Sequence, residues 1–394
     1  MAIYLDHAAT TPLRREALDA MLPFLGTTFG NPSSAHSFGR AARNALDEAH
    51  ERLAAALGAT AREIVFTSGG TEANNLALKG AAWAGKARGH RLVTTAVEHH
   101  AVGHTLRHLE TFGFEVVEVP VDRAGRVDPD EVESAIDGRT LLVSVMLANN
   151  EVGTIQPVVG IAERVRRHRG VLLHVDAVQA APWLDLDVGA LGADLVVLGA
   201  HKFEGPKGTG ALWVRRGTQL MPQAHGGSQE RHRRAGTENV AGAVGMAVAY
   251  ELACAEKPAT RARVGALRER LAAGCLAVPG VEPTGHPTER LPGLLSLVVH
   301  GADGTAIAVA LDLEGIAASP GSACATGSPE PSHVLLAMGY PAGVAAGALR
   351  LSLGRMTTEA EIDEACAIVP RVLAELREGG GAVTADPLGA RLDG

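Results

Sequence analysis

Lys202 is the residue of this sequence best placed for covalent chemistry. It directly follows an apolar run, LVVLGA at 195–200, and precedes a Gly/Pro-rich segment. Ligand sites of open α/β sheets lie at such strand ends, and a lysine partly removed from water can form a Schiff base with an aldehyde. The other four lysines, Lys79, Lys86, Lys207 and Lys257, fit solvated positions. The alternative is a lysine that merely extends to solvent from a strand end.

Asp176 ends a second apolar run, VLLHVD. A carboxylate at the end of a buried strand needs a charged partner. The protonated ring nitrogen of pyridoxal phosphate is such a partner, and its protonation makes the ring an electron sink. By itself Asp176 equally fits a helix N-cap or a metal ligand. Together with Lys202, it predicts a pyridoxal phosphate site.

A third strand, IVFT, breaks at Ser68-Gly69-Gly70, and a helix is expected from about Thr71. Small residues let backbone N–H groups approach an anion, and a helix N-terminus favours negative charge, so the turn suits a phosphate. No lysine follows the glycines, which distinguishes the segment from a nucleotide-binding loop. A plain strand-to-helix turn is the alternative.

His99 follows a further strand, in the segment Glu98-His99-His100. An imidazole here can stack on a cofactor ring and move protons near neutral pH. The nearby His104 and His108 raise the alternative of a metal site. No HExxH or similar set accompanies them, so we expect no metal.

Cys324 and Arg350 complete the chemistry-bearing residues. Cys324 lies in a Gly/Ser/Pro-rich segment at 318–332, predicted to be a loop that can carry a thiol to a substrate. The other cysteines sit in alanine-rich helical patterns, as small apolar residues do. Arg350, on a short strand with Arg355 nearby, can bind a carboxylate in a fork. The alternatives are an incidental loop cysteine and surface ion pairs.

The elements that must position these residues alternate between short apolar strands and longer helices. Strands are expected near 64, 92, 116, 142, 172 and 195, and helices at 37–58, 71–88, 101–112 and 156–169. This alternation predicts an α/β fold with a mostly parallel sheet. A helix after Glu238 is expected to break at Lys257-Pro258.

Beyond that break, the pattern indicates a smaller α+β domain with strands near 295 and 350. Thr358 and Glu361 predict a capping box for its last helix. We therefore expect a large domain at 14–258, a small domain made of 1–13 and 259–378, and a loose tail at 379–394.

The composition restricts the partners. The 394 residues carry a net charge of -8 without a run of like charges, so neither nucleic acid nor a membrane surface is favoured. No apolar stretch reaches membrane-spanning length, and no secretion signal is evident. We expect a cytoplasmic protein that acts on a small molecule.

Eleven motifs, in order, resemble those of cysteine desulfurases from residue 3 to about 375. They are YLDHAATTP, GNPSSAHSFGR, SGGTEANN, VEHHA, NNEVGTIQP, HVDAVQ, AHKFEGPKG, RAGTEN, GSACATG, EPSHVLLAMG and RLSLGRMTTEAEID. The Gly-Ser-Ala-Cys segment is similar to the nitrogen-fixation and iron-sulfur-cluster branch of that family.

The resemblance implies fold-type I of the pyridoxal phosphate enzymes, class V aminotransferase-like: a large transferase domain with a seven-stranded type of sheet, working as a homodimer. It implies that Lys202 is the Schiff-base lysine, Cys324 the nucleophile that receives sulfur as a persulfide, and His99 a ring-stacking acid/base. It assigns the other sites as follows: Asp176 to the ring nitrogen, Gln179 to the ring hydroxyl, Asn150 to ring and substrate, Gly70, Thr71, His201 and the partner subunit's Thr237 to the phosphate, and Arg350 to the substrate carboxylate.

One position departs from the family pattern. Gly199 stands where the family usually has a phosphate-binding serine, so one hydrogen bond is missing. The expected reaction converts L-cysteine to L-alanine, with sulfur passed on to an iron-sulfur scaffold or a thiolation enzyme. The alternatives are another pyridoxal phosphate enzyme, such as an aminotransferase or selenocysteine lyase, and a non-catalytic sulfur-trafficking scaffold.

Overall fold

A seven-stranded sheet forms the centre of the molecule. The computed structural model describes residues 2–321 and 331–378. The strand order is β2 (Ile64–Thr67), β8 (Gly210–Val214), β7 (Leu195–Gly199), β6 (Leu172–Asp176), β5 (Thr140–Met146), β3 (Arg91–Thr95) and β4 (Glu115–Val119). Only β8 among these strands runs antiparallel to its neighbours. The predicted α/β class and the mostly parallel sheet are confirmed.

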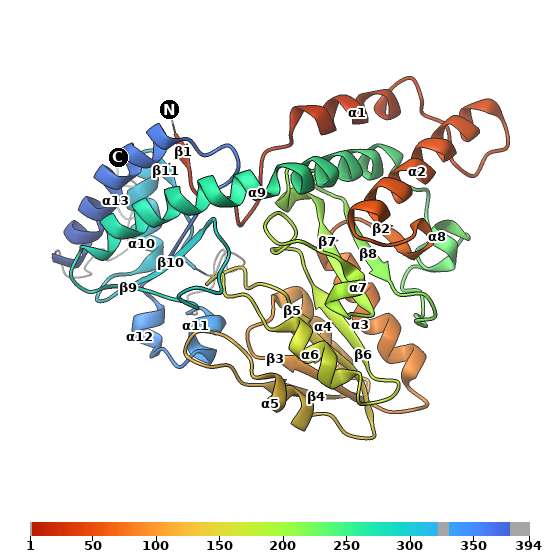
Figure 1. Ribbon diagram of the computed structural model, residues 1–394, viewed down its shortest axis with the longest axis horizontal. Helices are drawn as coiled ribbons and strands as arrows, with labels where there is room; N and C mark the ends of the chain where they lie inside the picture. Colours follow the sequence, from red (N-terminus) through yellow and green to blue (C-terminus); the bar gives the residue numbers. More distant parts are fainter. Residues whose placement is uncertain (1, 322–330, 379–394) are drawn as a thin grey trace, which may run out of the picture.

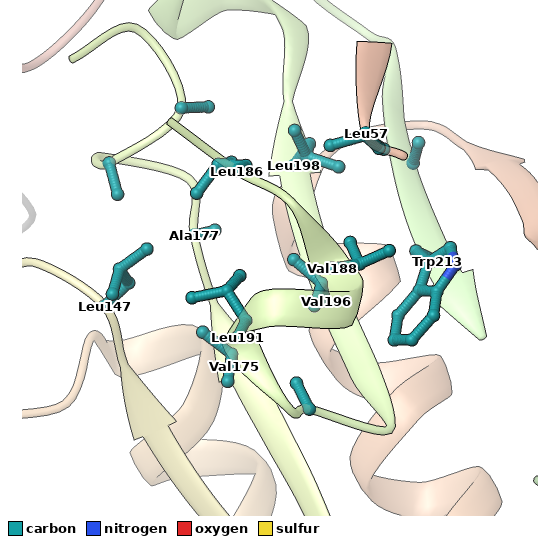
Figure 2. Close-up of a cluster of buried hydrophobic side chains, with 14 of the residues drawn as sticks. Leu57, Leu147, Val175, Ala177, Leu186, Val188, Leu191, Val196, Leu198 and Trp213 are labelled. Atoms are coloured by element: carbon teal, nitrogen blue, oxygen red, sulfur yellow. The ribbon is translucent and has the colours of Figure 1, made fainter. Parts of the chain in front are cut away.

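Helices cover both faces of this sheet because its strands are apolar on both sides. All seven residues of β5 are buried. On one face lie α3 (Gly70–Gly85) and α4 (His100–Glu110). On the other lie α2 (Ser37–Ala56), α6 (Val158–Val165) and α7 (Val188–Leu191). Figure 2 shows part of the cluster on this other face, where Val188 lies near Val196 and Trp213, and Leu191 lies near Val175.

Helix α9 (Val240–Leu276) contradicts the predicted break. It continues through Pro258 and spans the molecule from the central sheet to the smaller sheet (Figure 1). Its first half packs into the core of the large sheet and its second half into the core of the small one. Because tertiary packing along the whole length stabilises the helix, it outweighs the hydrogen bond that proline removes.

Lys257 also differs from its predicted solvated position. Its side chain is only 2% exposed, and Nζ donates a hydrogen bond to the Leu184 carbonyl at 2.7 Å. The ammonium lies 3.8 Å from the Asp185 carboxylate. Lys257 is therefore a buried residue of α9 that ties this helix to the loop after β6.

The smaller sheet is antiparallel, with β10 (Leu294–Val299) between β9 (Val281–Pro283) and β12 (Ala348–Ser352). Beside it, β1 (Ile3–Tyr4) pairs with β11 (Ile316–Ala317), so the N-terminus packs in this part. The expected capping box is confirmed at the start of α13 (Glu359–Glu378), where Thr358 and Glu361 exchange hydrogen bonds. The division into domains at residue 258 stays a prediction.

Two further helices are α1 (Arg15–Leu25) and α10 (Gly304–Leu313), and the remaining elements are short. They are the 3-10 turns η1 (Ala61–Glu63) and η2 (Ala200–Lys202) and the helices α5 (Pro129–Ser134), α8 (Gln229–His232), α11 (His333–Ala337) and α12 (Ala342–Ala345). Within the described ranges, no helix is both long and apolar enough to cross a membrane.

Candidate active site

A cavity of about 270 Å³ lies at the carboxyl ends of the parallel strands. Its walls come from the segments that follow β2, β3, β5, β6 and β7, and from β12 of the smaller sheet. The cavity brings together most of the side chains that the sequence singled out. These are Gly70, Thr71, His99, Asn150, Asp176, Gln179, His201, Lys202 and Arg350.

Lys202 ends the 3-10 turn η2 and projects into this cavity. Its Nζ donates hydrogen bonds to the carbonyls of Ala8 at 2.6 Å and Ala9 at 2.8 Å. Two residues later, Glu204 has φ 61°, an uncommon conformation for a residue with a side chain. The Arg355 guanidinium holds the Glu204 carboxylate at 2.8 Å. The turn that carries Lys202 is thus fixed by contacts from the N-terminal segment and the smaller sheet.

Asp176 is buried at the end of β6, the strand that pairs with β7, and lines the same cavity. Its carboxylate accepts hydrogen bonds from Asn74 Nδ2 at 2.8 Å and from the Val178 N–H at 3.0 Å. Asp176 caps no helix among those described, which removes that alternative. Asn74 was missed as a site residue, although a buried amide on the apolar face of α3 is a sequence signal for such a role.

The anion-binding end of the cavity lies where α3 begins at Gly70. The space beside Gly69 is open, since a Cβ there would meet no atom within 4 Å. Gly70 faces Val178, whose Cγ2 would lie 2.8 Å from an added Cβ. The first N–H groups of a helix have no intrahelical partner and suit a phosphate. His201 borders the same end, and burial lowers its pKa to about 4, so its imidazole is neutral.

His99 is held in place as the N-cap of α4. Its Nδ1 accepts a hydrogen bond from the Ala101 N–H at 3.1 Å. Burial lowers its pKa, an effect that the Asp176 carboxylate opposes and the Lys202 ammonium reinforces. The Nδ1 contact leaves Nε2 as the ring atom available to carry a proton.

Glu98, next to His99, is fully buried between two strand ends. Its Oε1 accepts hydrogen bonds from Thr95 Oγ1 at 2.7 Å and from the Met146 N–H at 2.9 Å. Burial raises the pKa of Glu98 to about 8. Glu98 is therefore a protonated carboxyl at neutral pH that joins β3 to β5 beneath the site.

Arg350 reaches the cavity from β12 with a side chain that is 1% exposed. Its guanidinium donates to the Asn150 carbonyl at 2.8 Å and to Asp6 Oδ1 at 2.9 Å, whereas Nε has no partner among the described residues. A surface ion pair, the alternative for this arginine, is wrong because Arg350 is buried. Asp6, in the YLDHAATTP motif, was not predicted as a site residue.

Two predicted residues are not placed on this cavity. Cys324 lies outside the described residues. Thr237 is exposed and does not line the cavity of its own chain. Just after the undescribed segment, Ser332 donates a hydrogen bond to the buried Glu151.

His100, His104 and His333 stack on one another beside the cavity, with ring centroids 4.7 and 4.8 Å apart. Within residues 2–321 and 331–378, no group of three or more metal-ligating side chains is close enough to hold a metal ion.

The donor set of the cavity fits pyridoxal phosphate. A buried carboxylate, Asp176, can face a protonated ring nitrogen, and the Lys202 amine can hold an aldehyde. The open glycine turn at the start of α3 and the neutral His201 suit the phosphate. Asn74 Oδ1 is buried and unpartnered among the described residues, so it too leaves a polar contact for a bound group.

Comparison with known proteins agrees with this chemistry. A family model described as aminotransferase class-V matches residues 3–365. A cysteine desulfurase IscS from Methanosarcina thermophila is 47% identical over 95% of this chain and 93% of its own length. One from Dictyoglomus turgidum is 46% identical over 95% of each chain.

Solved structures are similar over nearly the whole chain. A NifS-like protein has a TM-score of 0.90 at 38% identity, covering 95% of this chain and 100% of its own. A structure titled SspA in complex with cysteine has a TM-score of 0.80 at 34% identity, covering 90% and 100%.

Proposed function

This chain belongs to the class-V aminotransferase family, and on that premise we propose that the cavity around Lys202 is where it acts on L-cysteine. The chain is a pyridoxal-phosphate-dependent cysteine desulfurase, as are relatives 45–47% identical over 95% of its length. The observation that supports the location best is that Lys202, Asp176, His99 and Arg350 line one cavity, although they come from segments far apart in the sequence.

The cofactor is held at three points. Asp176, oriented by Asn74, binds the ring nitrogen, Lys202 binds the aldehyde carbon, and the start of α3 with His201 binds the phosphate. When bound, pyridoxal phosphate holds the substrate amine and withdraws electrons from the α-carbon. The partner subunit's Thr237 adds to the phosphate site.

The substrate is oriented through its carboxylate. Arg350 binds this group in a fork, and its position is fixed by the Asn150 carbonyl and Asp6. Asp6 offsets part of the positive charge, so the site does not hold a buried cation without a partner when the substrate is absent.

Proton transfers fall to Lys202 and His99. Lys202 Nζ takes the α-proton of the substrate, because its side chain lines the cavity together with His99 and Arg350. His99 is kept neutral by burial and, because Nδ1 accepts from the Ala101 N–H, carries its proton at Nε2, from which it donates a hydrogen bond to the reacting groups. The Cys324 thiolate then attacks the substrate sulfur, and the new S–S bond forms as the Cβ–S bond breaks. The electron pair of the broken bond stays with the substrate, whose Cβ takes up the equivalent of the proton that the thiol lost, so the products are a persulfide on the enzyme and alanine.

A homodimer completes the enzyme in this proposal. The segment 25–38, which we call the N-terminal arm, exposes large apolar side chains, with Phe29 71% and Leu25 63% exposed. The ring of Phe38 lies 5.6 Å from that of Phe29, measured between centroids. Exposed apolar patches of this kind mark interaction sites. A second copy that covers the arm also accounts for Thr237, which lies outside the cavity of its own chain.

The persulfide sulfur then passes to an acceptor protein, either an iron-sulfur scaffold or a thiolation enzyme. We place the protein in the cytoplasm, where thiols are kept reduced. A persulfide carrier needs a free thiol, and such a compartment preserves it.

The decisive experiment is borohydride reduction of the holoenzyme followed by peptide mapping. The cofactor label is expected on Lys202, and the Lys207→Ala variant serves as the matched control because it removes a neighbouring loop lysine. Label on any other lysine contradicts the proposed site. Cys324→Ala is expected to retain the bound cofactor and to release no sulfide from cysteine. Turnover to a keto acid instead of alanine would indicate an aminotransferase.

A further inference from the structure

A second hollow, of about 580 Å³, lies at the opposite end of β2 from the active site. It is formed by η1, the segment after β8 and the turn around α8. It shares no residue with the cavity around Lys202. Four arginines line it, namely Arg62, Arg216, Arg231 and Arg233. We call this set the arginine hollow.

The arginine hollow has few carboxylates near it. In the part of the chain that the structure describes, no carboxylate lies within ion-pair distance of any of the four guanidinium groups. Glu63 is the acidic residue of the lining, and its oxygens accept hydrogen bonds from the Thr60 N–H and hydroxyl at 2.9 Å and from the Arg216 N–H at 3.1 Å. The oxygens of Glu63 are thus occupied by backbone and hydroxyl donors, and its charge acts on Arg233 only from beyond ion-pair distance, as the charge of Glu230 does on Arg231 and Arg233.

Two of the guanidinium groups are fixed by backbone contacts. Arg231 Nη1 donates to the Ile64 carbonyl at 3.1 Å, and Arg233 Nη1 donates to the Arg62 carbonyl at 3.3 Å. Each contact uses one of five N–H donors, so most remain for a ligand. Burial lowers the pKa of both groups, and neighbouring arginines lower it further.

The turn that presents these arginines is held in an unusual conformation. Glu230, Arg231 and His232 have φ values of 44°, 58° and 63°, three consecutive residues in the left-handed region. A buried hydrogen bond between His50 Nε2 and Glu230 Oε2, at 3.0 Å, anchors the turn. The surrounding structure therefore enforces a conformation that brings Arg231 and Arg233 beside Arg62 and Arg216.

We propose that the arginine hollow is a binding site for a small anion that carries two or more phosphate groups. Four arginines without an ion-pair partner among the described residues concentrate positive charge in a chain whose net charge is -8, and this local charge favours an anion. Guanidinium groups match phosphate oxygens in a two-point fork. A single phosphate would leave part of the arginine set without a partner, whereas a linked pair or triple of phosphates can reach all of it.

The lining also restricts the rest of the ligand. No aromatic side chain lines the hollow within the described ranges, and the neighbouring Trp213 is 3% exposed. A nucleobase would find no ring on which to stack. The site is therefore suited to the phosphate groups themselves, as in pyrophosphate and tripolyphosphate.

The test is calorimetric titration of the full-length holoenzyme, freed of unbound cofactor, with sodium tripolyphosphate in a buffer of low ionic strength, ~50 mM. One site per chain is expected, with affinity at least about tenfold above that for orthophosphate. Replacing two exposed arginines, Arg62→Gln with Arg216→Gln, is expected to weaken binding by roughly tenfold or more, because each loses a charge-assisted bond.

These two replacements do not disturb the fold, since neither side chain makes a hydrogen bond in the structure described here. Arg88→Gln with Arg169→Gln is the matched control: it removes the same two charges from exposed positions outside the hollow and is expected to leave binding unchanged. Retained cofactor absorbance verifies that each variant is intact. The proposal is overturned if tripolyphosphate produces no saturable heat, if the control weakens binding equally, or if a glutamate-only peptide binds at least as tightly, which would identify a site for acidic protein segments.

Discussion

Gly199 is the single residue at which we expect the affinity for the cofactor phosphate to be adjustable. A Cβ at this position would lie 3.8 Å from the Gly70 amide nitrogen, but only 3.3 Å from Val178 Cγ1. A serine there would therefore place a hydroxyl beside the anion-binding turn once Val178 shifts by a few tenths of an ångström.

We expect Gly199→Ser to tighten cofactor binding by about fivefold, the equivalent of one added hydrogen bond of ~1 kcal/mol. The measurement is titration of the apoenzyme with pyridoxal phosphate. Gly199→Ala is the control, because it adds the Cβ without the hydroxyl. Equal affinity in the serine and alanine variants would show that the hydroxyl makes no contact with the phosphate.

Asp6 has two opposing effects on the same site. It partners the buried Arg350 at 2.9 Å and so competes with the substrate carboxylate for that guanidinium. Asp6→Asn is expected to lower KM for cysteine several-fold and to destabilise the apoenzyme by about 2 kcal/mol, because Arg350 then lacks a charged partner when no substrate is bound. Steady-state kinetics and urea unfolding measure the two effects. A higher KM with unchanged stability would contradict this role.

Glu98, next to His99 in the sequence, connects two strands. Its carboxyl group accepts hydrogen bonds from residues at the ends of β3 and β5. Its folded-state pKa of about 8 lies above the ordinary value of 4.5. Between about pH 4.5 and pH 8, Glu98 keeps its proton in the folded state and loses it in the unfolded chain. The contribution of Glu98 to stability is therefore complete below about pH 4.5 and falls as the pH rises toward 8.

The free energy of unfolding of the wild type is expected to fall, relative to that of Glu98→Gln, by up to about 1.4 kcal/mol per pH unit across this window. Urea denaturation at several pH values measures the difference. Glutamine keeps an uncharged amide, so histidines and other titrating groups contribute equally to both proteins. Parallel stability profiles would mean that Glu98 is ionised in the fold.

The whole molecule is predicted to be a dimer that assembles through the N-terminal arm. The chain has a mass of 40.7 kDa, so sedimentation should give about twice that value. Phe29→Asp is expected to shift the protein toward the monomer and to weaken cofactor binding, because the partner's Thr237 is then lost from the phosphate site. Leu313→Ser is the control, since Leu313 is 85% exposed on α10, outside the arm. A Phe29→Asp variant that remains dimeric would place the interface elsewhere.

Sequence patterns over a few residues predicted much of the fold, because a strand or a helix start depends mainly on residues that are neighbours in the sequence. Apolar β-branched runs identified the six strands expected for the large sheet, and Thr358 with Glu361 identified a helix start. The same reasoning failed at Pro258, where the composition indicates a break. Contacts of α9 with two separate cores, made by residues distant in sequence, keep that helix continuous.

The sequence by itself determined which residues are candidates for chemistry and that they lie close together, because Lys202, Asp176, His99 and the glycine turn each follow an apolar strand, and parallel strands end at one edge of a sheet. Only the tertiary structure decided what orients them. Asn74 on Asp176, Asp6 on Arg350 and the carbonyls of Ala8 and Ala9 on Lys202 are contacts between segments roughly 100 to 340 residues apart. Such pairs depend on chain packing in three dimensions, and no local periodicity or motif spacing encodes them.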